Sequence, residues 1–74
     1  MVQSDRDLLL MVERHIADGE RTIAAQEHRL LLSEARGDDT TLSRSLLQNF
    51  KETLALHYQH RAAIARELRA RGAE

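Results

Sequence analysis

The stretch that decides the fold is ERHIADG (residues 13–19), ERTIAAQ (20–26) and EHRLLLS (27–33), followed by EAR (34–36). Each seven-residue unit begins with Glu and carries Ile16, Ile23 or Leu30 at its fourth position. A repeat of seven with one strong apolar position is typical of an α-helix that packs along a seam against another helix. The sequence therefore predicts an all-α protein built from long, coiled-coil-like helices.

The clearest break in the helical pattern is the segment GDDT, residues 37–40. Gly37 suits the left-handed residue that ends a helix, and one of Asp38, Asp39 and Thr40 can accept from the free amides that begin the next helix. The sequence does not say which of the three is the cap. We predict a single antiparallel hairpin in residues 1–74, with helices over about 5–36 and 40–71 and a turn at 37–40.

Folding the chain at this turn pairs the seam positions of the two helices. The predicted layers are Leu30–Leu47, Gln26–Phe50, Ile23–Leu54, Gly19–His57, Ile16–Arg61, Val12–Ile64 and Leu9–Leu68. Gly19, His57 and Arg61 form a candidate polar layer in this core. Gly19 leaves room for the imidazole, is simply tolerated in mid-helix, or marks a hinge or ligand notch. Arg61 either extends outward or meets Glu13 or Glu20, because an unpaired buried guanidinium is costly.

A second apolar stripe runs beside each seam and predicts an interface. Its members are Leu10, Ala17, Ala24 and Leu31 in the first helix, and Leu42, Leu56, Ala63 and Ala70 in the second. A lone hairpin would leave these side chains in water, and an extended exposed apolar stripe usually marks a contact surface. We expect two hairpins to form a four-helix bundle as a homodimer, and the sequence does not distinguish this dimer from a tetramer.

Composition points to a small core that needs support. Aromatic residues make up 3 % of the 74 residues, and the chain has neither Cys nor Pro, so no disulfide or Cys-based metal site can supplement the core. The longest apolar run near the start, residues 8–12, is too short for a secretory signal or a membrane span. A cytoplasmic protein with no membrane partner is the expectation.

Charge is nearly balanced overall but unevenly distributed. The net charge is −1, whereas nucleic-acid-binding domains usually carry a basic excess. Residues 1–41 hold nine acids and five bases, and residues 42–74 hold three acids and six bases, so the two halves attract each other as a hairpin would require. A nucleic-acid or anionic-surface accessory protein that uses the basic residues 61–71 is the alternative function.

Chemistry-bearing residues form no recognisable active site. His57 and His60 are spaced as in some bundle metal sites, but the acids of a Glu-x-x-His pair are missing, so a metal-dependent bundle is only a second alternative. The Glu13, Glu20, Glu27 and Glu34 ladder is typical of a solvated face or of ion pairs between subunits. We predict no enzyme, no metal and no cofactor, and a small interaction or regulatory protein that binds itself and an unknown protein partner.

Three segments carry a resemblance to a known group of proteins. They are residues 13–23, residues 37–42 and residues 50–57, the last reading FKETLALH. Together they resemble short uncharacterised helical-hairpin proteins of rhizobial and related α-proteobacteria. The resemblance implies a free-standing bacterial hairpin, and it brings no activity, cofactor or catalytic residue with it.

Overall fold

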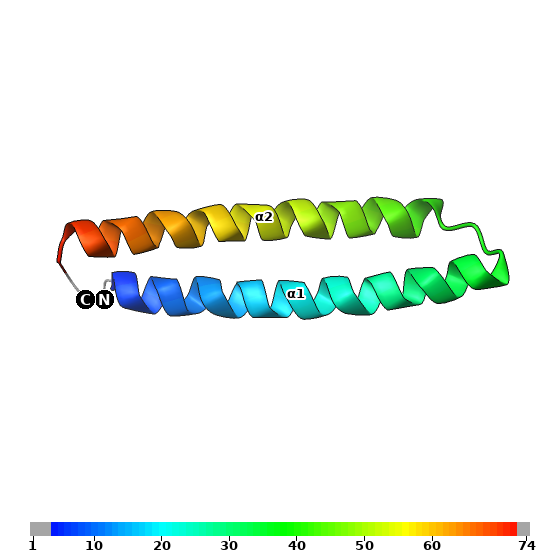
Figure 1. The fold of residues 1–74 in the computed structure, drawn as a ribbon, viewed down its shortest axis with the longest axis horizontal. Helices are drawn as coiled ribbons and strands as arrows, with labels where there is room; N and C mark the ends of the chain where they lie inside the picture. The colour runs from blue at the N-terminus through cyan, green and yellow to red at the C-terminus, as the bar shows by residue number, and fades with distance from the viewer. Residues whose placement is uncertain (1–3, 73–74) are drawn as a thin grey trace.

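The computed structural model describes residues 4–72 as two helices, α1 (Asp5–Arg36) and α2 (Thr41–Ala70). The helices run antiparallel and side by side along their whole length, joined by the turn at one end (Figure 1). The molecule measures 54 × 20 × 16 Å. The predicted antiparallel two-helix hairpin is therefore confirmed, with α2 one residue shorter at each end than expected.

The ends of α1 follow the chemistry of its flanking residues. The Ser4 side chain accepts a hydrogen bond of 3.1 Å from the amide of Asp7 and so caps the first turn. Gly37 has φ +79°, in the left-handed region, and its amide donates to the Glu34 carbonyl while that of Asp38 donates to the Ser33 carbonyl. These two bonds form a Schellman motif, which satisfies carbonyls that the helix end would otherwise leave free.

The start of α2 divides the capping role between two residues. Thr40 is the N-cap by backbone position, but its side chain makes no capping bond. Asp39 supplies the acceptor instead, because its Oδ1 accepts from the amide of Thr41 at 3.0 Å and from the Thr41 hydroxyl at 2.8 Å. Thr40 is buried, and its hydroxyl accepts from Nε of Arg44 at 3.0 Å.

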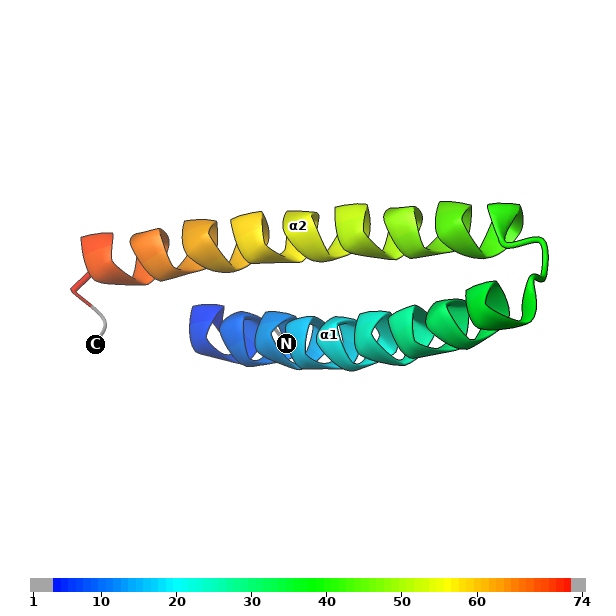
Figure 2. The same cartoon turned by 45° about the vertical axis from the view of Figure 1, so that its right-hand side comes forward.

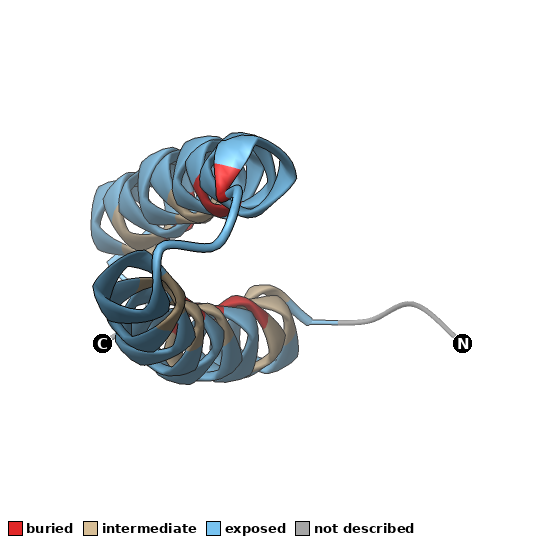
Figure 3. Cartoon of the chain, turned by 90° about the vertical axis from the view of Figure 1, so that its right-hand side faces the viewer, coloured by how far each residue is buried: buried red, intermediate tan, exposed pale blue. Residues whose placement is uncertain are grey.

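The core is a thin line of aliphatic side chains between the helices. The buried hydrophobic residues are Val12, Ile16, Ile23, Leu47 and Ile64. Val12, Ile16 and Ile64 form one cluster, and Leu8, Leu9, Leu54 and Leu68 pack against it. The buried positions lie where the ribbons face each other, and most of the outer ribbon is exposed (Figure 3).

Two of the predicted core layers need correction. Arg61 is exposed, and its guanidinium lies 5.3 Å from the centre of the Tyr58 ring, so it does not share a buried layer with Ile16. A long side chain can place its charge in water at little cost, which decides between the two predicted fates of Arg61. Gly19 and His57 are both partly buried, but a Cβ on Gly19 would meet Cδ1 of Leu54 at 3.3 Å, so Leu54 is the residue that faces Gly19.

Candidate interaction site

Polar pairs between the helices line one side of the seam, which we call the paired flank. Glu34 pairs with Arg44, Glu27 with Lys51 at 3.2 Å, and Glu20 accepts a hydrogen bond of 2.5 Å from the Tyr58 hydroxyl. The three Glu residues are seven positions apart in α1, and their partners are seven positions apart in α2. The pairs therefore stand at regular intervals along the hairpin. The Glu ladder was expected to be solvated or to pair between subunits, and three of its members pair within the chain.

Tyr58 carries the clearest electrostatic perturbation on the paired flank. Its hydrogen bond to Glu20 raises the pKa of the phenol above its usual value of 10.0, because the bond is lost when the hydroxyl ionises. Desolvation and the charge of Glu20 raise this pKa further, while the Arg61 guanidinium lowers it. The group is at the surface, so this is an arrangement of polar contacts and not a buried catalytic acid.

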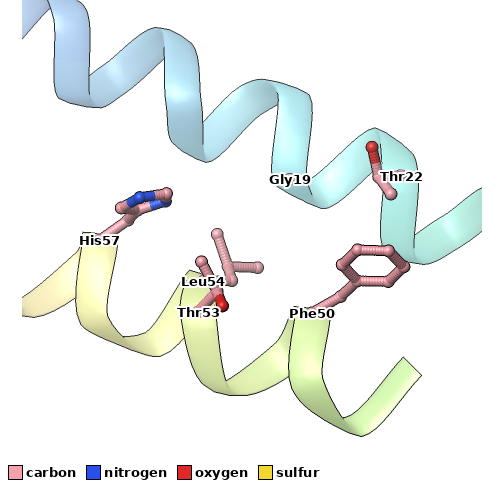
Figure 4. A pocket seen from close by; sticks show the side chains of 6 residues that line it. All are labelled: Gly19, Thr22, Phe50, Thr53, Leu54 and His57. Atoms are coloured by element: carbon pink, nitrogen blue, oxygen red, sulfur yellow. The ribbon is translucent and has the colours of Figure 1, made fainter. Parts of the chain in front are cut away.

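The opposite side of the seam, the open flank, holds a hollow of about 140 Å³ instead of a row of ion pairs. The hollow is lined by Gly19, Thr22, Phe50, Thr53, Leu54 and His57. Leu54 points from α2 toward Gly19, with the rings of Phe50 and His57 on either side (Figure 4). Gly19 and His57 thus line one hollow, as their predicted pairing suggests, but Arg61 is not among the residues that form it.

The heptad spacing extends the open flank along the whole hairpin. We define it by the positions seven residues apart from Thr22 and Thr53: Leu8, His15, Thr22 and Arg29 of α1, and Leu46, Thr53, His60 and Glu67 of α2. The ring of His15 lies 5.4 Å from that of His57, which joins the two helices beside the hollow. Sequence reasoning missed this flank, although the positions at multiples of seven residues from Thr22 in the first helix and from Thr53 in the second could have indicated it.

The predicted interface stripes are exposed but do not form one surface. Of their eight members, all are exposed except the partly buried Ala17. The stripe of α1 lies beside the paired flank, because each of its members precedes a Glu of the ladder by three residues: Leu10, Ala17, Ala24 and Leu31. The stripe of α2 lies beside the open flank, because each of its members is three or four residues from an α2 residue of that flank. The members are Leu42, Leu56, Ala63 and Ala70. The two stripes therefore occupy opposite corners of the hairpin and cannot together form one continuous interface.

The basic end of α2 is partly neutralised. Arg71 pairs with Asp5 across the hairpin and with Glu67 one turn earlier, at 3.2 Å. Arg66 and Arg69 are exposed. Within residues 4–72 no group of three or more His, Asp or Glu side chains is arranged to hold a metal ion, and neither helix contains an apolar window long enough to cross a bilayer.

No protein-family model, no curated protein and no solved structure matches this chain. Its function must therefore be inferred from its own surfaces.

Proposed function

We propose that this protein is a small non-enzymatic interaction module that works as a self-associated helical bundle, with two hairpins forming four helices. The observation that carries the proposal is the imbalance between buried and exposed apolar side chains. Five hydrophobic residues are buried, whereas eight large ones of the described chain are exposed: Leu10, Leu31, Leu32, Leu42, Leu46, Phe50, Leu56 and Tyr58. Burial of such side chains is the main favourable term in protein association.

The total surface supports the same proposal. The chain exposes 5669 Å². A compact monomer of 8.5 kDa is expected to expose roughly 4,700 Å². The excess of about 1,000 Å² follows from the elongated hairpin, and a second hairpin along one flank would remove an area of this size from water.

A bundle of two hairpins would still leave one apolar surface for another protein. If the open flank is covered by a second copy, the stripe beside the paired flank stays in solvent, with Leu31 65 % and Leu10 54 % exposed. Apolar side chains arranged along a helix face are suited to docking the helix of a partner. We assign this stripe to the unknown protein partner and the opposite flank to self-association.

Self-association is tested by the mass of the folded protein in solution. Sedimentation equilibrium, with helical content followed by circular dichroism, should give a helical species of twice the chain mass at micromolar concentration. A folded, helical species that keeps the mass of one chain at all concentrations would refute the proposal.

A further inference from the structure

We infer that a second copy of this chain docks on the open flank with its turn at the opposite end, so that α1 lies against α1 and α2 against α2. This inference rests on the proposed function and adds the surface and the orientation. A two-fold interface of this kind uses the same patch on both copies, so each residue contact occurs twice.

The two flanks of the seam differ in what they offer a second copy. On the paired flank, polar contacts of Glu20, Glu27 and Glu34 bridge the helices, and covering them would remove charged groups from water. On the open flank, Phe50 and Leu46 are 38 % and 45 % exposed, and the hollow between the helices is mostly apolar in its lining. Covering the open flank therefore removes apolar surface from water and leaves the polar contacts of the paired flank in solvent.

The hollow lies at the middle of the hairpin, where a two-fold axis across its length would pass. The middle of α1 falls between residues 20 and 21, and Thr22 and Gly19 lie about 2 Å along the helix from it, at 1.5 Å per residue. Thr22 is exposed and has a short side chain, so two copies of α1 can approach closely there. In this arrangement the two hollows face each other. The rings of Phe50 and His57, which belong to α2, lie on the side that meets α2 of the other copy.

The charged residues at the ends of the open flank select this orientation. Arg29 lies about 13 Å from the middle of α1 toward the turn, and Glu67 lies about 17 Å from the middle of α2 toward the open end. Turns at opposite ends bring Arg29 of α1 to nearly the same level as Glu67 on α2 of the second copy, the helix that lies diagonally opposite in the bundle. Turns at the same end would leave these charges about 30 Å apart. Arg29 makes no ion pair within residues 4–72, so it is available for this contact.

The area of the face is sufficient for a stable pair. A flank of 54 by 20 Å has a projected area of about 1,000 Å². A standard protein–protein interface buries about 800 Å² on each partner. One copy therefore covers the open flank along its length, and a short peptide or a small ligand would leave most of it exposed.

Disulfide cross-linking tests the surface and the orientation, because the chain has no Cys of its own. In the Thr22→Cys variant the two thiols should face each other near the axis, and mild oxidation should give a covalent dimer in high yield. Arg29→Cys and Leu31→Cys are matched controls that should stay uncrosslinked. In Arg29→Cys the two thiols lie about 26 Å apart along the helix direction, too far for a disulfide. In Leu31→Cys the thiol lies beside the paired flank, away from the proposed interface.

The outcomes separate this inference from the proposed function. If the wild type is dimeric but Thr22→Cys does not cross-link, the inference fails while self-association stands. If oxidation instead joins Thr22→Cys to Thr53→Cys in a mixture of the two variants, the turns lie at the same end and the orientation is overturned. If the wild type is monomeric, both fail.

A charge exchange tests the orientation without a covalent bond. Arg29→Glu should weaken dimerisation by about two- to fivefold at low salt, the range for an exposed ion pair, and the added Glu67→Arg should restore it. An Arg29→Glu variant that dimerises as well as the wild type, or a double variant that is no better than the single one, would contradict the antiparallel contact.

Discussion

Tyr58 is the residue whose titration reports most directly on the packing of the two helices. Its hydroxyl donates to Glu20 only when α1 and α2 are in register, so folding favours the protonated phenol and raises its pKa above 10.0. The stabilisation from this bond is present below pH 10 and is lost as the pH rises through the raised pKa of the folded state. Absorbance of the phenolate measures this pKa cleanly because the chain has one Tyr and no Trp.

The Glu20→Gln variant supplies the control for this titration. The amide carries no charge and accepts a weaker hydrogen bond than a carboxylate, so both effects of Glu20 diminish and we expect the pKa of Tyr58 to fall toward 10.0 in the folded variant. An unchanged titration curve in Glu20→Gln would mean that Glu20 does not hold the phenol in solution.

Gly19 and Gly37 should respond in opposite directions to the same substitution. Gly19 is mid-helix, where Ala is favoured by about 1 kcal/mol, and its new Cβ would displace only the end of the flexible Leu54 side chain beside a hollow. Gly19→Ala should therefore raise the melting temperature. Gly37 has φ +79°, so Gly37→Ala should destabilise the hairpin by about 1 kcal/mol although nothing lies within 4 Å of its Cβ.

The partner of Gly19 is tested by a larger side chain. Gly19→Leu should cost about 1–3 kcal/mol by overpacking against Leu54, and Leu54→Ala should relieve it, so the double variant should be more stable than the sum of the single changes. If His57→Ala recovered the stability lost in Gly19→Leu and Leu54→Ala did not, His57 would be the residue that faces Gly19, as the sequence predicted.

At the scale of the helices, the cap of α2 makes stability depend on acid. The two bonds that Asp39 accepts from Thr41 lower the pKa of its carboxyl below 3.8. The contribution of this cap is therefore present above pH 3.8 and is lost as the pH falls through the lowered pKa of the folded state. Asp39→Asn should keep the cap but lose this pH dependence, whereas Asp39→Ala should lose both, as acid titrations followed by circular dichroism would show.

The helices were predictable from sequence, but the flanks beside their seam were not. The heptads, Ser4 and Gly37 locate α1 to the residue, because periodicity and capping are local properties of the chain. The partners of Glu20, Glu27 and Glu34 depend on how each helix is rotated about its axis, which no local pattern records. A small rotation also decides that Leu54 faces Gly19 and that Arg61 reaches the surface.

The whole molecule combines two long helices with a core only one side chain deep. Turned by 45°, the hairpin shows α1 and α2 as two rods side by side, with no third element among residues 4–72 covering either of them (Figure 2). Isolated helices of about 30 residues gain most of their stability from packing, so a lone hairpin has little reserve against the loss of a core residue. Stability and self-association should therefore be measured together, because an interface on the open flank would extend the same core.

Ile16→Ala makes this coupling visible. Ile16 is 4 % exposed in the main cluster, and its truncation should cost about 2–5 kcal/mol, a large share of the stability of a domain of this size. At low protein concentration the variant should lose its helical circular dichroism. At high concentration the signal should return, because association stabilises the folded state by mass action. Leu31→Ala, at a residue that is 65 % exposed, is the control that should stay helical throughout. A melting temperature of Ile16→Ala that did not change with concentration would show that folding and association are independent, and the hairpin would then have to be stable by itself.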